Sequence, residues 1–124
     1  MWGLWPPAGG GGADGRNSIG YLKEKWELVT GTSLSIPYFN GHGFASPVAL
    51  LRDRSTGRTV WFINVHNPAD TWKYHGQAPY RAAAVRKELA AMRELSADGT
   101  PVVLLGDMNA KDAFYCAAVG PGSA

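Results

Sequence analysis

Three polar side chains follow two mainly apolar runs of the sequence. Residues 60–65 lead into His66, and residues 102–105 lead into Gly106-Asp107-Met108-Asn109. A carboxylate can orient a water molecule for attack, and an imidazole or an amide can donate a hydrogen bond to a phosphoryl oxygen in the transition state. Together these residue types predict the hydrolysis of a phosphoester, with His66, Asp107 and Asn109 as the catalytic candidates.

The order of the two runs predicts that they are parallel strands of one βαβ unit, which spans residues 58–109. We expect a helix between them, from Pro79 to about Ser96, because apolar residues recur there at steps of three and four. A strand–helix–strand unit of this length crosses over right-handedly to a parallel neighbour. The carboxyl ends of the strands then meet at one edge of the sheet, where ligands bind in α/β folds. His66 and Asp107 are therefore expected side by side.

The ends of the chain are predicted to be flexible. Residues 1–16 include the Gly-rich stretch 8–15 and are interpreted as a flexible lead-in, and residues 117–124 as a flexible tail. Residues 17–116 are the predicted domain, although a partial one.

Within that domain, residues 18–22 and 26–30 are predicted to be two short strands of one hairpin, because β-branched and aromatic residues are bounded there by turn formers. Residues 36–47 contain several Gly and Pro residues and are expected to form a loop. Residues 48–53 are predicted to pair antiparallel with the strand 58–66, through a tight turn. Alternation along that second strand places Asn64 on the same face as His66.

Length and composition favour one globular domain. The chain has 124 residues, of which 45% are hydrophobic and 18% are charged. The net charge is +2, and the basic residues are interspersed with acidic ones, so the sequence lacks the basic stripe typical of nucleic-acid binders. No run reaches the roughly 18 apolar residues of a transmembrane helix. Cys116 is the single cysteine, which excludes an intrachain disulfide and leaves the compartment open.

Each motif also has a structural interpretation. A histidine at a strand end is often a hydrogen-bonded structural residue. Asp and Asn in a Gly-Asp-x-Asn sequence commonly cap their own backbone in a turn. The joint placement of the three candidates across one βαβ unit is what favours a site.

The same residues resemble the endonuclease/exonuclease/phosphatase superfamily, whose fold is that of deoxyribonuclease I. Residues 60–66 are similar to the family's strand that ends in the active-site histidine, and residues 102–110 to its Gly-Asp-x-Asn motif. Residues 17–21 are similar to an earlier strand that approaches the site. The resemblance implies an α/β fold, here a partial four-layer α/β sandwich, of which this chain is a central fragment.

The resemblance also implies a role for each candidate. Asp107 orients or activates the attacking water, Asn109 binds the scissile phosphate or a metal-bound water, and His66 stabilises the pentacovalent transition state. Asn17, Asn64 and Asn67 are the candidate substrate-binding residues. The expected partner is a phosphoester substrate, and the sequence leaves open whether it is a nucleic acid, a lipid or a sugar phosphate.

Complete domains of the family use Mg²⁺ or Mn²⁺. They begin with a strand ending in a metal-site Asn and a later metal-ligating Glu, and they end with an Asp-His pair; this sequence shows neither part. Because Asp107 is the one convincing carboxylate, we assign no metal ligand and expect no tightly held metal in this chain. Whether the 124-residue chain is itself an enzyme stays open, and the alternative is a non-catalytic α/β remnant or binding module.

Overall fold

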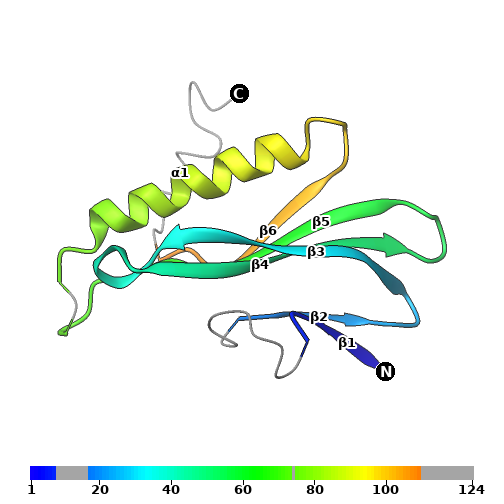
Figure 1. Cartoon of the computed structure of the whole chain (residues 1–124), viewed down its shortest axis with the longest axis horizontal. Coiled ribbons are helices and arrows are strands. Elements are labelled where there is room, and N and C mark those ends of the chain that lie inside the picture. The colour runs from blue at the N-terminus through cyan, green and yellow to red at the C-terminus, as the bar shows by residue number, and fades with distance from the viewer. Residues whose placement is uncertain (8–16, 74, 110–124) are drawn as a thin grey trace.

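A computed structural model describes residues 1–7, 17–73 and 75–109 of the chain (Figure 1). The four strands β3 to β6 form one mixed sheet in the order β3-β4-β5-β6, and β1 and β2 form a separate antiparallel pair. The elements are β1 (Trp2–Trp5), β2 (Ile19–Leu22), β3 (Trp26–Pro37), the 3-10 helix η1 (Phe39–Gly41), β4 (Gly43–Asp53), β5 (Thr59–His66), α1 (Ala78–Leu95) and β6 (Val102–Asp107).

These elements form three layers. Helix α1 covers one face of the four-stranded sheet, and the β1–β2 pair lies against the opposite face (Figure 1). Under the helix, Ile63 and Val65 of β5 are almost fully buried and pack with Met92 and Leu95. This arrangement is α/β and corresponds to part of the four-layer sandwich that was predicted.

The predicted βαβ unit is confirmed. Strand β5 pairs with β4 on one side and in parallel with β6 on the other, so it lies inside the sheet. Helix α1 begins at Ala78 and ends at Leu95, within one residue of the expected bounds at each end. The parallel register pairs His66 directly with Asp107.

The predicted hairpin of residues 18–22 and 26–30 is wrong. Strand β2 pairs with β1, while β3 pairs with β4. The expected lead-in therefore contains a strand at Trp2–Trp5, whereas residues 8–16 lie outside the described residues. The indole N–H of Trp5 donates to the carbonyl oxygen of Thr32 at 3.0 Å, and the ring packs on the buried side chains of Ile19, Ala49 and Leu51. These contacts of Trp5 with residues distant in the sequence are what local patterns could not show.

The predicted loop over residues 36–47 is also wrong, because most of it belongs to a long β3–β4 hairpin that turns at η1. Ile36 and Phe44 are opposite each other in the register, and both are buried. Pro47 is tolerated because the paired register of β4 with β5 begins one residue later, with Val48 opposite Ile63. Burial of apolar side chains has overridden the turn-forming composition.

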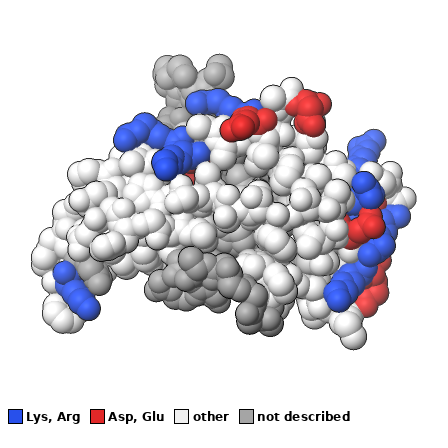
Figure 2. Space-filling view, viewed as in Figure 1, with Lys and Arg blue, Asp and Glu red and all other residues white. Residues whose placement is uncertain are grey.

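The described part of the chain shows no concentrated basic face in the view of Figure 2. Charged side chains gather over α1 and at the end of the sheet that holds the β4–β5 turn, and the surface between them is mainly uncharged. Among the described residues, no helix has both the length and the apolar character needed to cross a membrane. The expected tail, residues 117–124, and residues 110–116 lie outside the described residues.

Candidate active site

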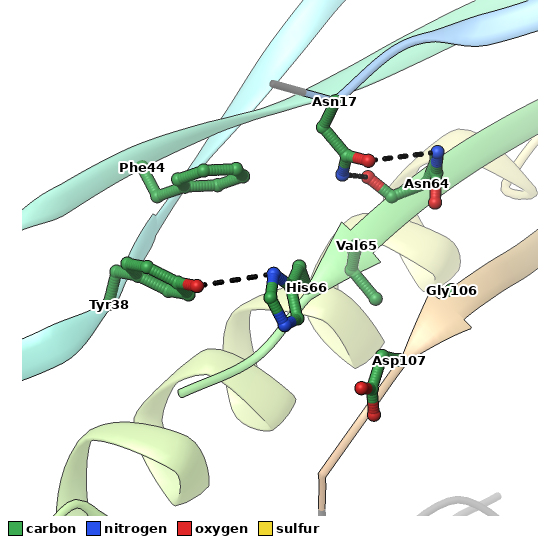
Figure 3. A pocket seen from close by; sticks show the side chains of 8 residues that line it. All are labelled: Asn17, Tyr38, Phe44, Asn64, Val65, His66, Gly106 and Asp107. Atoms are coloured by element: carbon green, nitrogen blue, oxygen red, sulfur yellow. Dashed lines mark hydrogen bonds between the residues drawn. The ribbon is translucent and has the colours of Figure 1, made fainter. Parts of the chain in front are cut away.

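The carboxyl ends of β5 and β6 form one wall of a pocket of about 450 Å³ (Figure 3). His66 and Asp107, both exposed, are neighbours across the parallel strands. The residues lining the pocket are Asn17, Tyr38, Phe44, Asn64, Val65, His66, Gly106 and Asp107. Two of the three catalytic candidates therefore share one open cavity.

Gly106 allows the two strands to meet at this point. Its φ is 122°, and a Cβ atom on it would lie 2.0 Å from the carbonyl oxygen of Val65. A side chain at position 106 would therefore collide with the backbone of β5. Glycine is required for the close approach of β6 to β5, which brings Asp107 beside His66.

Asn109 reaches the same edge through a turn. Strand β6 ends at Asp107, and Asn109 has a positive φ of 51°, so Asn109 lies beyond the strand. The backbone N–H of Asn109 donates to Oδ1 of Asp107 at 3.0 Å. Its side-chain Nδ2 donates to the carbonyl oxygen of Asn67 at 2.7 Å, which ties Asn109 to the residue after β5.

Tyr38 is a functional candidate that the sequence did not single out. Its hydroxyl lies 3.2 Å from Nδ1 of His66, and its ring packs near those of Phe39 and Phe44 (Figure 3). When the hydroxyl donates to Nδ1, the proton of a neutral imidazole is on Nε2, which is then a donor. The sequence shows only that residues 38 and 39 are aromatic. Their closeness to His66 depends on the β3–β4 turn, which the sequence did not predict.

Asn17 and Asn64, which also line the pocket, are joined by hydrogen bonds. Asn17 Nδ2 donates to the carbonyl oxygen of Asn64 at 2.9 Å, and Asn64 Nδ2 donates to Oδ1 of Asn17 at 3.1 Å and to the carbonyl oxygen of Ser18 at 2.8 Å. These bonds join the start of β2 to the end of β5 (Figure 3). Two of the three predicted substrate-binding residues, Asn17 and Asn64, therefore line the pocket.

Asn67 lies elsewhere. Its side chain is fully buried, and Nδ2 donates to Oε2 of Glu88 on α1 at 3.1 Å. The side-chain amide therefore belongs to the core, which differs from the expectation of a substrate-binding group. The backbone of Asn67 remains at the site, because its N–H donates to the carbonyl oxygen of Asp107 at 2.9 Å and its carbonyl accepts from Asn109.

Glu88 is a buried carboxyl group close to the site. Its side chain is 0% exposed, and burial raises its pKa to about 7, against the opposing effect of the hydrogen bond from Asn67. The sequence indicated only that residue 88 lies on the predicted helix, and nothing in it identified the partner.

The described residues do not by themselves fit a divalent metal. They contain no group of three His, Cys, Asp or Glu side chains that could hold one, and Asp107 is the only carboxylate lining the pocket. Mg²⁺ prefers several oxygen ligands in octahedral geometry.

Comparison with solved structures identifies the fold. The chain is similar to the human Nocturnin catalytic domain, solved with a bound sulfate anion (TM-score 0.65, 16% identity, 86% of this chain and 39% of that chain). It is also similar to an endonuclease/exonuclease/phosphatase family protein of Bacteroides thetaiotaomicron (TM-score 0.65, 21% identity, 85% and 40%). A mannosyl-6-phosphatase of Bacteroides thetaiotaomicron gives a TM-score of 0.64 at 19% identity, covering 85% of this chain and 42% of that chain.

These similarities show that the chain adopts part of the fold of the endonuclease/exonuclease/phosphatase proteins, as the resemblance in the sequence implied. The chain spans about two-fifths of the length of the proteins it matches. No protein-family model matches the sequence, and no curated protein is significantly similar to it.

Proposed function

We propose that this chain is the central part of a metal-dependent phosphoester hydrolase. The observation that carries the proposal is the direct pairing of His66 with Asp107 at the carboxyl ends of parallel strands, in an open pocket. The fold supports the same class, because the similar solved structures include a phosphatase and other proteins of the endonuclease/exonuclease/phosphatase family. Mg²⁺ or Mn²⁺ is the proposed cofactor of the complete domain.

In the proposed reaction, Asp107 accepts a hydrogen bond from a water molecule and orients its oxygen toward phosphorus. The water oxygen bonds to phosphorus as the bond from phosphorus to the leaving oxygen breaks; one proton of the water passes to the Asp107 carboxylate, and the leaving oxygen takes up a proton from solvent. His66, with Tyr38 donating to Nδ1, donates from Nε2 to a phosphoryl oxygen. One hydrogen of Asn109 Nδ2 is used by Asn67, and the second is proposed to donate to the phosphate.

The proposed substrate contains a tetrahedral phosphoryl anion. The sulfate bound in the Nocturnin structure has the same shape and a similar charge, which supports anion binding by this fold. Asn17 and Asn64 are proposed to contact the remainder of the substrate, since both line the pocket. A nucleic acid, a lipid and a sugar phosphate are the substrate classes to compare.

The first experiment measures hydrolysis of bis(p-nitrophenyl) phosphate with Mg²⁺, by the 124-residue chain and by any longer protein that contains it. His66→Ala and Asp107→Asn should each lower turnover by about a hundredfold or more, as expected for the loss of a transition-state donor or of a catalytic carboxylate. His75→Ala and Asp98→Asn, at exposed positions outside the pocket, are the matched controls. Near-normal turnover in both site variants would contradict the proposal.

A non-catalytic binding module is the second candidate. It is favoured by the turn in which Asp107 Oδ1 accepts the backbone N–H of Asn109, because this bond gives the carboxylate a structural role. A titration with Mg²⁺ of a longer protein that contains this chain, followed by tryptophan fluorescence, separates the two functions. The binding module predicts no dependence of stability or binding on the metal, together with no hydrolysis by any form of the protein.

A further inference from the structure

Glu88 and Asn67 form a buried acid–amide pair beneath the candidate active site. Both side chains are 0% exposed, and a single hydrogen bond, from Asn67 Nδ2 to Glu88 Oε2 at 3.1 Å, joins them. The second oxygen of each group, Oε1 of Glu88 and Oδ1 of Asn67, has no hydrogen-bond partner among the described residues. An ionised Glu88 would leave both buried acceptors, Glu88 Oε1 and Asn67 Oδ1, without a donor, which is costly.

A proton on Glu88 would supply the missing donor. A neutral carboxyl group has one O–H donor, and a carboxylic acid can form two reciprocal hydrogen bonds with an amide. Donation from Oε1 of Glu88 to Oδ1 of Asn67 would satisfy both atoms with one proton. Burial, which raises the pKa of Glu88 to about 7, favours the same neutral form.

Charged residues on α1 and at the end of β6 have partners other than Glu88. Arg81, on the same helix, pairs with Asp70 and donates to the carbonyl oxygen of Pro68. Lys87 donates to the carbonyl oxygen of Ser35 on β3, and Asp107 at the end of β6 accepts from the backbone of Asn109. None of these groups shifts the pKa of Glu88, whose two influences are burial and the bond from Asn67.

The backbone of Asn67 connects this pair to the site. Its N–H donates to the carbonyl oxygen of Asp107 at 2.9 Å, and its carbonyl accepts from Asn109 Nδ2 at 2.7 Å. Asn67 directly follows His66 in the chain. One residue, held in the core by its side chain, therefore contacts or adjoins all three catalytic candidates.

We propose that Glu88 is a positioning residue: its uncharged carboxyl group holds the Asn67 side chain, and thereby fixes the main chain on which Asp107 and Asn109 depend. Glu88 touches neither the substrate nor the reacting atoms. A role of Glu88 in catalysis rests on the proposed function, but its effect on the position of Asn109 can be tested without an activity assay.

The test follows the side-chain amide resonances of Asn109 by ¹H–¹⁵N NMR, which report its bond to the Asn67 carbonyl. In the wild-type chain these resonances should move as Glu88 ionises, with a midpoint near pH 7. In Glu88→Gln, which supplies an uncharged amide of the same size, this step should disappear while the low-pH position is kept. Glu94→Gln, an exposed position on the same helix, should titrate like the wild type.

A second variant, Glu88→Leu, removes the partner of Asn67 without adding charge. If it folds, the Asn109 amide should shift toward the position of a free amide, and Glu88→Gln should not. The proposal is overturned if the Asn109 amide resonances move with pH in the same way in the wild type and in Glu88→Gln. It is also overturned if Glu88→Leu folds and its Asn109 amide resonances stay at the wild-type position. Neither result depends on hydrolysis, so failure of this inference and failure of the proposed function are distinguishable.

Discussion

The stability of the protein should fall with rising pH because of Glu88, and Glu88→Gln should remove that dependence. The pKa of Glu88 is raised by burial from 4.5 to about 7. The folded state therefore binds the proton more tightly than the unfolded state. The stabilisation is fully present below pH 4.5, where both states are protonated, and it is lost as pH rises through 7.

The size of the effect follows from the shift. Each pKa unit corresponds to about 1.4 kcal/mol, so the shift of Glu88 corresponds to about 3 kcal/mol of unfolding free energy between mildly acidic and mildly alkaline solution. Gln does not titrate and can form the same two bonds with Asn67. The difference in unfolding free energy between Glu88→Gln and wild type should therefore grow by about 3 kcal/mol in favour of the variant across this range.

The assay is urea unfolding followed by tryptophan fluorescence, at several pH values from 4.5 to 8.5, for the wild type, Glu88→Gln and Glu94→Gln. All titrating groups other than Glu88, including the three histidines, are the same in the wild type and in Glu88→Gln and cancel in their difference. The exposed control should follow the wild type. A difference between Glu88→Gln and wild type that stays constant with pH would refute the reasoning, because it would mean that Glu88 ionises normally in the folded protein.

Two further substitutions test the geometry of the strand ends. Gly106→Ala places a Cβ atom 2.0 Å from the Val65 carbonyl oxygen at a positive φ, and should lower the unfolding free energy by about 3 kcal/mol. Gly57→Ala, at a positive φ in open space, should lower it by only about 1 kcal/mol in the same urea assay. Equal losses in the two variants would contradict the close approach of β6 to β5. Tyr38→Phe removes the hydroxyl next to His66 Nδ1, so ¹⁵N NMR of the imidazole should show more of the tautomer protonated on Nδ1. An unchanged tautomer ratio would show that Tyr38 does not select the tautomer protonated on Nε2.

The local pattern was sufficient for the βαβ unit. Strand β5, helix α1 and strand β6 each have a strong apolar periodicity or a continuous apolar run, and the chirality of such units is nearly invariant. The meeting of His66 with Asp107 followed from that topology alone, before any side-chain contact was known.

The N-terminal half was predicted less well because its pairing is long-range. Strand β1 pairs with β2 across an intervening Gly-rich segment of sequence, and the β3–β4 hairpin continues through residues with turn-forming composition. Trp5 is partly buried and Phe44 is buried, in both cases by partners that are distant in the sequence or on the opposite strand. Propensity is a weak guide where such burial decides the conformation.

The sequence by itself determined the parallel strand pair, the helix between them and the placement of His66 and Asp107 at one edge, because these depend on periodicity and on the handedness of one connection. Only the tertiary structure decided that Tyr38 contacts His66, that Asn109 reaches the site through a turn, and that Asn67 is held in the core by Glu88. These contacts join side chains from four different elements or turns, and their distances are set by packing of the layers, which no local pattern contains.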